Sequence, residues 1–208
     1  MFTGIIEEKG RLQAIKQDNQ SLQLVIQASK ITTDLKVGDS ISVNGVCLTV
    51  TDFTATSFQV DVIPETFRGS SLAQLSRQSP VNLERAMAAN GRFGGHFVSG
   101  HVDATGKITR VWQEDNAKYY QIAVPDSRYI SNKGSVAVDG TSLTVFGVTD
   151  HHFTISLIPE TQQATVLGEK KIGDTVNVEF DMLAKYMERL LQQPAEGLTE
   201  DKLEQYGF

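Results

Sequence analysis

An internal repeat is the feature that most constrains how this chain can fold. Residues 42–50 (SVNGVCLTV) return as residues 137–145 (AVDGTSLTV), and Ile-Pro-Glu-Thr at positions 63–66 returns unchanged at positions 158–161. Both pairs share one offset, because 142 − 47 = 95 and 158 − 63 = 95. Two more blocks follow in the same order: VNLE at 81–84 with VNVE at 176–179, and, one residue out of step, FTGII at 2–6 with VSGHV at 98–102. A unit of this length has room for its own core, so the sequence predicts two duplicated domains rather than a solenoid.

Within each copy the residues alternate between apolar and polar, as they do on half-buried strands. Residues 46–50 read Val-Cys-Leu-Thr-Val, and residues 141–145 repeat the phase. Asn-Gly at 44–45 and Asp-Gly at 139–140 are strong hairpin signals. We therefore predict an all-β fold of two tandem, duplicated six-stranded antiparallel β-barrels, each closed on itself so that no strand edge is exposed.

A segment near the C-terminus has a helical period instead. An apolar stripe runs through residues 182–193, and Pro194 marks its end. The stripe can cover the second barrel or pack against copies of itself, and the pattern does not separate the two. The predicted organisation is an N-terminal barrel at 1–96, a C-terminal barrel at 97–181, a C-terminal α-helix at 182–193 that is a candidate for oligomerisation, and a mobile acidic tail at 194–208.

Composition disfavours several classes of function. The chain has 208 residues, one cysteine and a formal net charge of −6. One cysteine excludes an intrachain disulfide, and without Cys or His clusters at ligand spacing a structural zinc is disfavoured. Dispersed cations on an acidic chain disfavour nucleic acid, and no segment resembles a signal peptide or a membrane span. We expect a cytoplasmic protein that binds a small, weakly charged molecule, with no nucleic-acid or membrane partner.

The strand phase predicts where a ligand binds. If the apolar residues of 46–50 fill the first barrel, Cys47 and Thr49 point outward on one face, and Ser142 and Thr144 form the same ledge on the second barrel. A small barrel has no room inside for a ligand. We therefore expect two pseudo-symmetric ligand sites on these ledges, each beside an Ile-Pro-Glu-Thr segment.

Each of these features also has a purely structural interpretation. A lone cysteine is usually a small buried apolar residue, and threonine is common in strands. Glu65 and Glu160 can be solvated loop charges, or their recurrence can reflect only a strand-end turn. The segment 94–101 contains glycines that permit close backbone approach and two histidines five residues apart, a spacing that does not favour a metal site. The same segment is equally typical of an inter-domain linker.

Five collinear motifs resemble the riboflavin synthase family. They are MFTGIIE at 1–7, NGVCLTV at 44–50, NLERA at 82–86, GGHFVSGHVD at 94–103 and VDGTSLTV at 138–145, and the resemblance extends from Met1 to about Gln192. It implies two six-stranded barrels and a C-terminal helix that assembles a homotrimer. It also implies the last step of riboflavin biosynthesis, in which two molecules of 6,7-dimethyl-8-ribityllumazine dismutate by four-carbon transfer into riboflavin and 5-amino-6-ribitylaminouracil. Neither a metal nor another cofactor is expected, and association with a lumazine synthase shell is left open.

The resemblance also implies site residues. In the family the working site joins the N-terminal barrel of one subunit to the C-terminal barrel of a neighbour, and Lys133 matches a position that reaches the neighbour's substrate. The implied catalytic residues are Cys47, His101 and Ser142. His101 would be a base or proton shuttle for the C7 methyl group, and Cys47 and Ser142 would assist addition at C7 of the acceptor. The implied substrate-binding residues are Phe2, Gly4, Ile5, Ile6, Ser40, Cys47, Leu48, Thr49, Asp61, Val62, Ile63, Pro64, Glu65, Thr66, Gly100, His101, Val102, Lys133, Asp139, Ser142, Leu143, Thr144, Ser156, Leu157, Ile158, Pro159, Glu160 and Thr161.

Two other functions compete with the enzyme. Lumazine and flavin proteins that serve as optical antennae have a similar fold and bind the chromophore without turnover, but they tend to lose the second-half histidine and the paired Ile-Pro-Glu-Thr segments that this chain keeps. A flavin-carrying electron-transfer domain would need a reductase module. No Gly-x-Gly-x-x-Gly fingerprint follows any predicted strand, which disfavours that reading.

Overall fold

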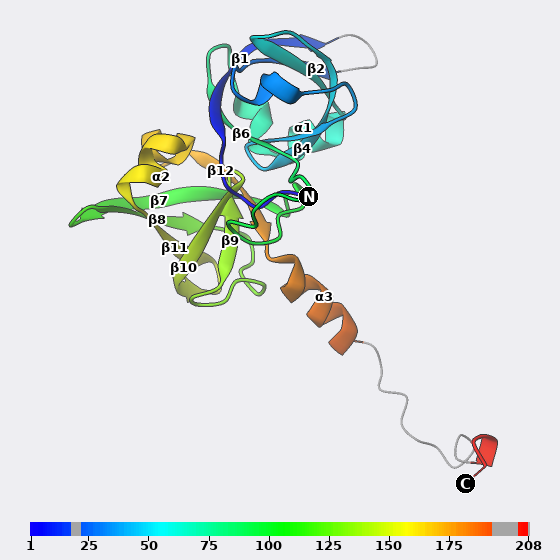
Figure 1. Cartoon of the computed structure of the whole chain (residues 1–208). Helices are drawn as coiled ribbons and strands as arrows, with labels where there is room; N and C mark the ends of the chain where they lie inside the picture. The colour runs from blue at the N-terminus through cyan, green and yellow to red at the C-terminus, as the bar shows by residue number, and fades with distance from the viewer. Residues whose placement is uncertain (18–21, 193–203, 208) are drawn as a thin grey trace.

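The structure is a computed structural model that describes residues 1–17, 22–192 and 204–207, and two closed antiparallel β-barrels form most of it (Figure 1). The first barrel has the circular order β1-β2-β5-β4-β3-β6, with β1 at Glu8–Gln17, β2 at Leu22–Gln27, β3 at Ser40–Val43, β4 at Val46–Phe53, β5 at Ser57–Val62 and β6 at Pro80–Arg85. The second has the order β10-β11-β8-β7-β12-β9, with β7 at Ala104–Glu114, β8 at Ala117–Ala123, β9 at Ser135–Val138, β10 at Thr141–Thr149, β11 at His152–Leu157 and β12 at Thr175–Phe180. Renumbering the second set from one gives the circular order of the first, so the predicted pair of six-stranded barrels is confirmed.

The Asn-Gly and Asp-Gly signals form equivalent hairpin turns. Asn44 (φ 47°) and Gly45 (φ 82°) join β3 to β4, and Asp139 (φ 43°) and Gly140 (φ 77°) join β9 to β10. Positive φ at both central residues is typical of the type I′ turn, whose twist matches that of the strands it joins. The two turns therefore set β4 and β10 in matching registers with their neighbours.

Each barrel has its own apolar core, as the length of the repeat predicts. On β4, Val46, Leu48 and Val50 are buried in the first core, whereas Cys47 is half-buried and Thr49 is exposed. The same alternation recurs along β10. The strand phase is thus as predicted, and the polar ledge of each barrel lies on its outer surface.

The two Ile-Pro-Glu-Thr segments begin short helices, α1 (Pro64–Gly69) and α2 (Pro159–Ala164). Proline suits a first helical turn because it lacks the N–H that this turn leaves unpaired, and glutamate is favoured near the positive end of a helix. Part of the recurrence therefore has a structural cause. Ile63 and Ile158, which precede the prolines, are 64% and 59% exposed and remain available to a ligand.

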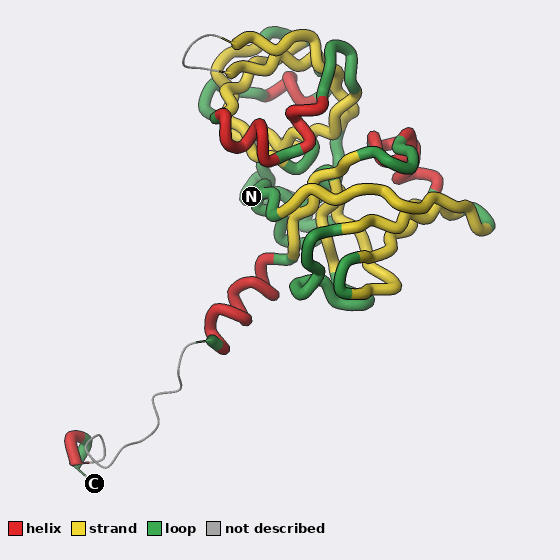
Figure 2. Tube along the Cα trace, turned by 180° about the vertical axis from the view of Figure 1, so that it is seen from behind, coloured by secondary structure: helices red, strands yellow, loops and turns green. Residues whose placement is uncertain are grey.

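Helical segments lie across the opening of the first barrel (Figure 2). This barrel also has the 3-10 turns η1 (Ile31–Asp34) and η2 (Ser71–Gln74), and the second barrel has η3 (Val166–Glu169).

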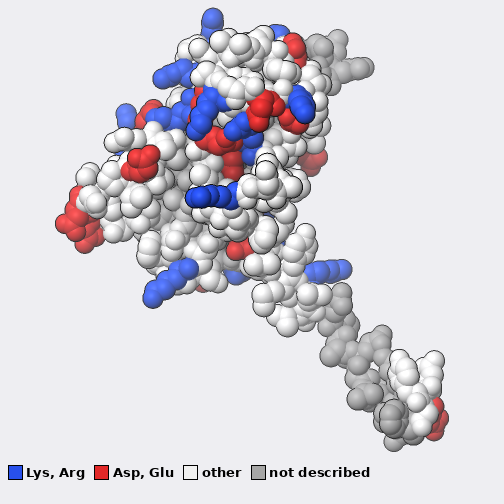
Figure 3. Space-filling view, in the orientation of Figure 1, with Lys and Arg blue, Asp and Glu red and all other residues white. Residues whose placement is uncertain are grey.

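The terminal helix α3 (Met182–Leu191) projects away from the barrels (Figure 1). The Asp181 side chain caps it by accepting a hydrogen bond from the Leu183 N–H at 3.0 Å, and Lys185 donates to both carboxylate oxygens of Asp103 at 2.9 and 2.8 Å. Its visible surface is largely uncharged, unlike the mixed charges over the barrels (Figure 3). The apolar side chains Leu183, Tyr186, Met187, Leu190 and Leu191 are all more than half exposed. Position 193 and most of the predicted tail, residues 194–203 and 208, lie outside the described residues.

A reciprocal network of buried amides joins the barrels. Asn82 of β6 donates from Nδ2 to the Asp139 carbonyl at 2.9 Å, and its Oδ1 accepts from the Val166 N–H at 2.8 Å. Asn177 of β12 makes the matching contacts in the other direction, to the Asn44 carbonyl at 2.8 Å and from the Ser71 N–H at 2.7 Å. Buried polar groups are costly unless they are paired, so this network fixes how the two barrels dock.

The network is asymmetric at one position, where Asp139 replaces Asn44. Burial raises the pKa of the Asp139 carboxyl above its ordinary value, although Lys170, with Nζ 3.4 Å from Oδ2, acts in the opposite direction. The folded state therefore binds this proton more tightly than the unfolded state, and stability is lost as pH rises above the ordinary aspartate pKa of about 3.9.

Asp139→Asn should remove this loss of stability. Asparagine already occupies the equivalent position 44, so the fold accommodates the amide. We expect the free energy of unfolding of the variant minus that of the wild type to increase from pH 4 to pH 7, so that the variant gains relative stability. Urea unfolding of both proteins at the two pH values measures the change. A difference that is the same at both pH values would contradict the raised pKa.

Candidate functional site

The segments that precede the two barrels cross over. The segment before the first barrel lies on the second barrel, and the segment before the second barrel lies on the first. They pair at Phe2 and Val98, whose main chains exchange hydrogen bonds of 2.8 and 3.2 Å. Beyond this point the Gly4 carbonyl accepts from the Ser142 N–H of the second barrel at 2.8 Å, and the Gly100 carbonyl accepts from the Cys47 N–H of the first barrel at 2.8 Å. Each ledge therefore gains one wall from the segment that leads into the other barrel.

Glycine is required where each segment meets its ledge. Gly4 and Gly100 have φ of 79° and 82°, a region that other residues enter only with strain. A Cβ at Gly4 would lie 2.6 Å from the Cβ of Ser142, and one at Gly100 would lie 2.5 Å from the Cβ of Cys47. These glycines allow the main chain to lie directly on the ledge.

The first groove is an open cavity of about 470 Å³ that brings Cys47 and His101 together. This volume is within the range of small-molecule sites. Its walls combine apolar surface, main chain and a few polar groups, as ligand sites do. The lining residues are Val46, Cys47, Ile63, Glu65, Thr66, Gly69, Ser70, Gly100, His101, Val102 and Asp103.

The second ledge differs because a histidine covers its serine. His96 Nδ1 lies 2.7 Å from Ser142 Oγ, and the His96 side chain is 8% exposed. Burial lowers the pKa of the His96 imidazole, although Asp181 acts in the opposite direction, which favours the neutral ring. A neutral imidazole accepts a hydrogen bond from the Ser142 hydroxyl group in the tautomer with an unprotonated Nδ1, and donates one to the hydroxyl oxygen in the other tautomer. The sequence pattern did not identify His96 as a site residue; its only signal was the glycine-rich segment around it.

The remaining predicted residues do not all face a groove. The side chains of Leu48, Val62, Leu143 and Leu157 are buried in the barrel cores, so only their main chains can contact a ligand. Phe2 is fully buried between the barrels, where it packs with Val98 and Ala137 against Cys47.

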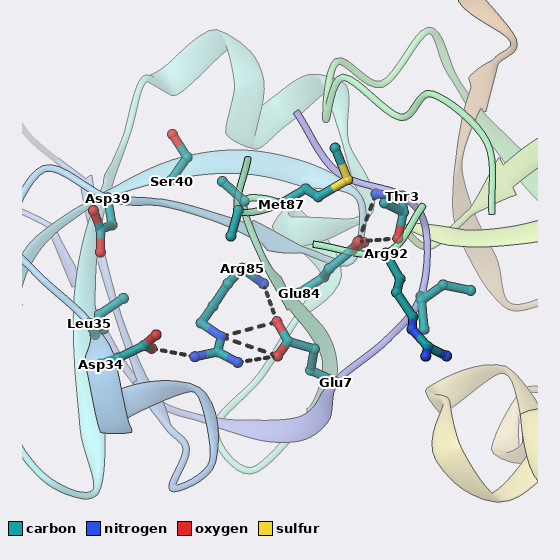
Figure 4. Close-up of a pocket in the computed structure, with 13 residues that line it drawn as sticks. Thr3, Glu7, Asp34, Leu35, Asp39, Ser40, Glu84, Arg85, Met87 and Arg92 are labelled. Carbon is teal, nitrogen blue, oxygen red and sulfur yellow. Dashed lines mark hydrogen bonds and ion pairs between the residues drawn. The ribbon is translucent and has the colours of Figure 1, made fainter. Parts of the chain in front are cut away.

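Three further predicted residues lie apart from the first groove. The Asp139 carboxylate is fully buried in the network between the barrels. Lys133 is exposed and donates its main-chain N–H to the Val145 carbonyl at 2.9 Å. Ser40 of β3 pairs with Thr49 of β4 and lines a separate cavity of about 360 Å³, together with Arg92 and Met87 (Figure 4).

Beside that cavity, Glu84 holds the leading segment that walls the second ledge. Figure 4 shows Glu84 of β6 pointing at Thr3: its Oε1 accepts from the Thr3 N–H at 2.7 Å and from Thr3 Oγ1 at 3.0 Å. Its Oε2 accepts from the Gly4 N–H at 3.0 Å. Burial raises the pKa of the Glu84 carboxyl, against the effect of these donors. Arg85 beside it forms ion pairs with Glu7 and Asp34.

The part of the chain that the structure describes contains no helix that is both long and apolar enough to cross a membrane. Within the same ranges, no three His, Cys, Asp or Glu side chains gather as a metal site would require.

Two like barrels, each with an outer ledge walled by the other's leading segment, define a tandem-barrel class, and the first ledge borders a cavity of small-molecule size. Comparisons with known proteins identify the family within this class. The family model of the lumazine binding domain matches twice, at residues 3–86 and 99–181. Curated riboflavin synthases are similar over nearly the whole chain: that of Bacillus subtilis is 54% identical over 98% of this chain and 95% of its own length, and that of Actinobacillus pleuropneumoniae is 49% identical over 100% of both. The chain belongs to the riboflavin synthase family.

Solved structures support the fold independently. LumP complexed with 6,7-dimethyl-8-(1'-D-ribityl) lumazine matches with a TM-score of 0.77 and 22% identity, over 86% of this chain and 98% of LumP. LumP complexed with riboflavin matches with a TM-score of 0.79, also at 22% identity, over 86% and 99% of the two chains. At this identity the likeness concerns the fold alone.

Proposed function

We propose that this protein is a riboflavin synthase that converts two molecules of 6,7-dimethyl-8-ribityllumazine into riboflavin and 5-amino-6-ribitylaminouracil. A four-carbon unit passes from the donor lumazine to the acceptor. The two products together contain all the atoms of the two substrates, so the reaction requires no oxidant and no added water. Membership of the family supports this activity, and the duplicated ledge is the observation that carries it.

Two related but unequal grooves suit a reaction between two identical molecules. Duplication supplies two places of similar shape for the same ring system, and divergence supplies two roles. Cys47 and His101 belong to one groove, whereas Ser142 and Ile5 hold the matching positions of the other. Holding two reactants in register removes the entropy of their encounter and contributes on the order of 7 kcal/mol or more in favourable cases.

For the catalytic residues we propose distinct tasks. His101 removes or relays a proton of the C7 methyl group of one lumazine, because histidine is the side chain that most often serves as a general acid or base. Cys47 and Ser142 assist addition at C7 of the acceptor. The contact between His96 and Ser142 supports the serine's part, since a neutral imidazole orients the hydroxyl group.

Incubation with the substrate alone tests the activity. The purified protein, with no added cofactor, is mixed with 6,7-dimethyl-8-ribityllumazine under anaerobic conditions, and the lumazine and riboflavin absorption bands are followed. We expect one riboflavin for every two lumazines consumed, over many turnovers. Tight binding with altered fluorescence and no riboflavin would instead support a chromophore-binding antenna.

His101→Gln should slow turnover without abolishing lumazine binding. Glutamine keeps a polar side chain in the groove but cannot accept a proton, so we expect kcat to fall by about 10²- to 10⁴-fold, the usual contribution of a general acid–base group. Steady-state kinetics and fluorescence titration measure the two effects separately. His151→Gln is the matched control, because His151 is exposed on the second barrel and bonds to the Pro125 carbonyl. Equal kcat in both variants would remove the proton-transfer role.

Assembly and location complete the proposal. A homotrimer formed through α3 would cover its exposed apolar stripe, and the molar mass in solution, by light scattering, tests this state. In the proposed trimer, each working site would be shared between subunits and would join the first groove of one subunit to the second ledge of a neighbour. The cytoplasm is the proposed compartment, and a lumazine synthase shell is the proposed protein partner.

A further inference from the structure

We propose that Glu179 is a positioning residue for His101. Its carboxylate, held on the second barrel, fixes the main chain of Ser99 and Gly100 and thereby sets His101 beside Cys47 in the first groove. The inference names a new determinant of the proposed site and rests on the proposed function for its effect on turnover.

The contacts of Glu179 converge on the residues just before His101. Glu179 lies on β12 and is 2% exposed. Its Oε1 accepts from the Ser99 N–H at 2.6 Å and from Ser99 Oγ at 2.7 Å, and its Oε2 accepts from the Gly100 N–H at 2.9 Å. Ser99 Oγ in turn accepts from the His101 N–H at 3.2 Å. A chain of hydrogen bonds thus runs from the carboxylate to the main chain of the proposed base.

This position requires a carboxylate rather than an amide. Both oxygens of Glu179 accept hydrogen bonds, and an ionised acceptor forms shorter and stronger bonds than a neutral one. Glutamine has a single acceptor oxygen, and its NH2 group would face an N–H of Ser99 or Gly100. Glu179→Gln therefore keeps the size of the side chain but releases one side of the clamp.

The far end of the His101 segment is anchored to the same strand. The Asp103 N–H donates to the Val178 carbonyl at 3.0 Å, and the Asp103 carboxylate accepts from the Phe180 N–H at 2.8 Å. His101 and Val102 are therefore the span between two anchors on β12. Releasing the anchor at Glu179 frees this span on the side that contacts Cys47.

The duplication supplies a matched control on the other groove. Glu84, the equivalent residue of β6, clamps Thr3 and Gly4 with the same set of donors. Gly4 lies on Ser142, not on Cys47. Glu84→Gln therefore makes the same chemical change at the wall of the second ledge and leaves the wall of the first groove in place.

Cys47 provides a readout that does not depend on turnover. It is the single cysteine of the chain, so the rate of its alkylation by iodoacetamide reports on the first groove alone. We expect Glu179→Gln to raise the labelling rate several-fold and Glu84→Gln to leave it at the wild-type value. In the dismutation assay Glu179→Gln should lower kcat by up to about 10²-fold with a smaller change in KM, because a displaced base acts on the reaction more than on binding.

A smaller change tests the last link. Ser99→Ala removes the hydroxyl group between Glu179 and His101 but leaves both main-chain N–H groups bonded to the carboxylate. We expect it to fold normally, by thermal unfolding, and to give labelling and kcat values between those of the wild type and Glu179→Gln. If Glu179→Gln does not fold, this variant decides the question.

Failure of the positioning role and failure of the proposed activity give different results. Wild-type labelling and wild-type kcat in Glu179→Gln, or in Ser99→Ala when the first variant is unfolded, would overturn the positioning role. Equal acceleration of labelling by Glu179→Gln and Glu84→Gln would also overturn it, because the effect would then be a general loosening of the barrels. A wild-type protein that produces no riboflavin would refute the proposed function, and the labelling comparison would still test the clamp.

Discussion

Gly100→Ala should destabilise the protein and displace one wall of the first groove at the same time. Gly100 has φ of 82°, where an alanine costs about 1–2 kcal/mol. Its Cβ would also lie 2.5 Å from the Cβ of Cys47 and 3.0 Å from Cε2 of the buried Phe2 ring. Such overpacking costs about 1–3 kcal/mol more, and relief of the contact requires the wall to leave the ledge. Urea unfolding and lumazine fluorescence titration measure the two losses.

Gly38→Ala separates backbone strain from the contact. Gly38 has φ of 94°, and apart from Gly38 itself and its two chain neighbours no atom lies within 4 Å of where its Cβ would be. This variant should therefore show the cost of positive φ alone, with lumazine binding unchanged. If the two variants lose the same stability and both bind lumazine as the wild type does, the close approach of Gly100 to Cys47 does not shape the groove.

Asn82→Ala should weaken the docking of the barrels more than any surface substitution. It leaves the Val166 N–H and the Asp139 carbonyl without the partners they have in the buried network. Each buried polar group left unpaired costs about 1–3 kcal/mol. Because the contacts lie between barrels with separate cores, we expect unfolding to change from one transition to two, with the barrels unfolding separately.

Asn177→Ala tests whether the network acts as a unit. It removes the reciprocal contacts to Asn44 and Ser71, so it should cost a similar free energy alone. In the double variant the second loss should be smaller than the first, because the barrels have already separated. Calorimetry measures the free energy of unfolding of the two single variants and of the double variant. Single variants within about 0.5 kcal/mol of the wild type would show that other contacts hold the barrels together.

Local signals in the sequence were sufficient to predict the barrels. The alternation along 46–50 and the Asn-Gly turn each describe a few neighbouring residues, and tertiary packing did not override them; the offset of 95 positions showed that the same signals occur twice. The same alternation predicted that Cys47 lies outside the core. It also implied that Leu48, although it belongs to the resembling motif, points inward and offers a ligand only its main chain.

The walls of the grooves were not predictable in the same way. Nothing in the order of residues says that the segment around Gly100 lies on the first barrel rather than the second, because its partners Cys47 and Glu179 are far away in the sequence. His96 escaped for a related reason. Its contact, Ser142, lies 46 residues further along the chain, so no local spacing links the two residues.

The crossed leading segments also bear on the history of this protein. A single barrel has a ledge but lacks the wall that a second barrel provides, so a one-barrel ancestor would have completed its grooves only as a symmetric dimer, with two identical sites. With both barrels in one chain, the exchange of walls is permanent. A single chain also lets cysteine and serine, or histidine and isoleucine, occupy formerly identical places, which no mutation in a homodimer can do because it alters both copies together.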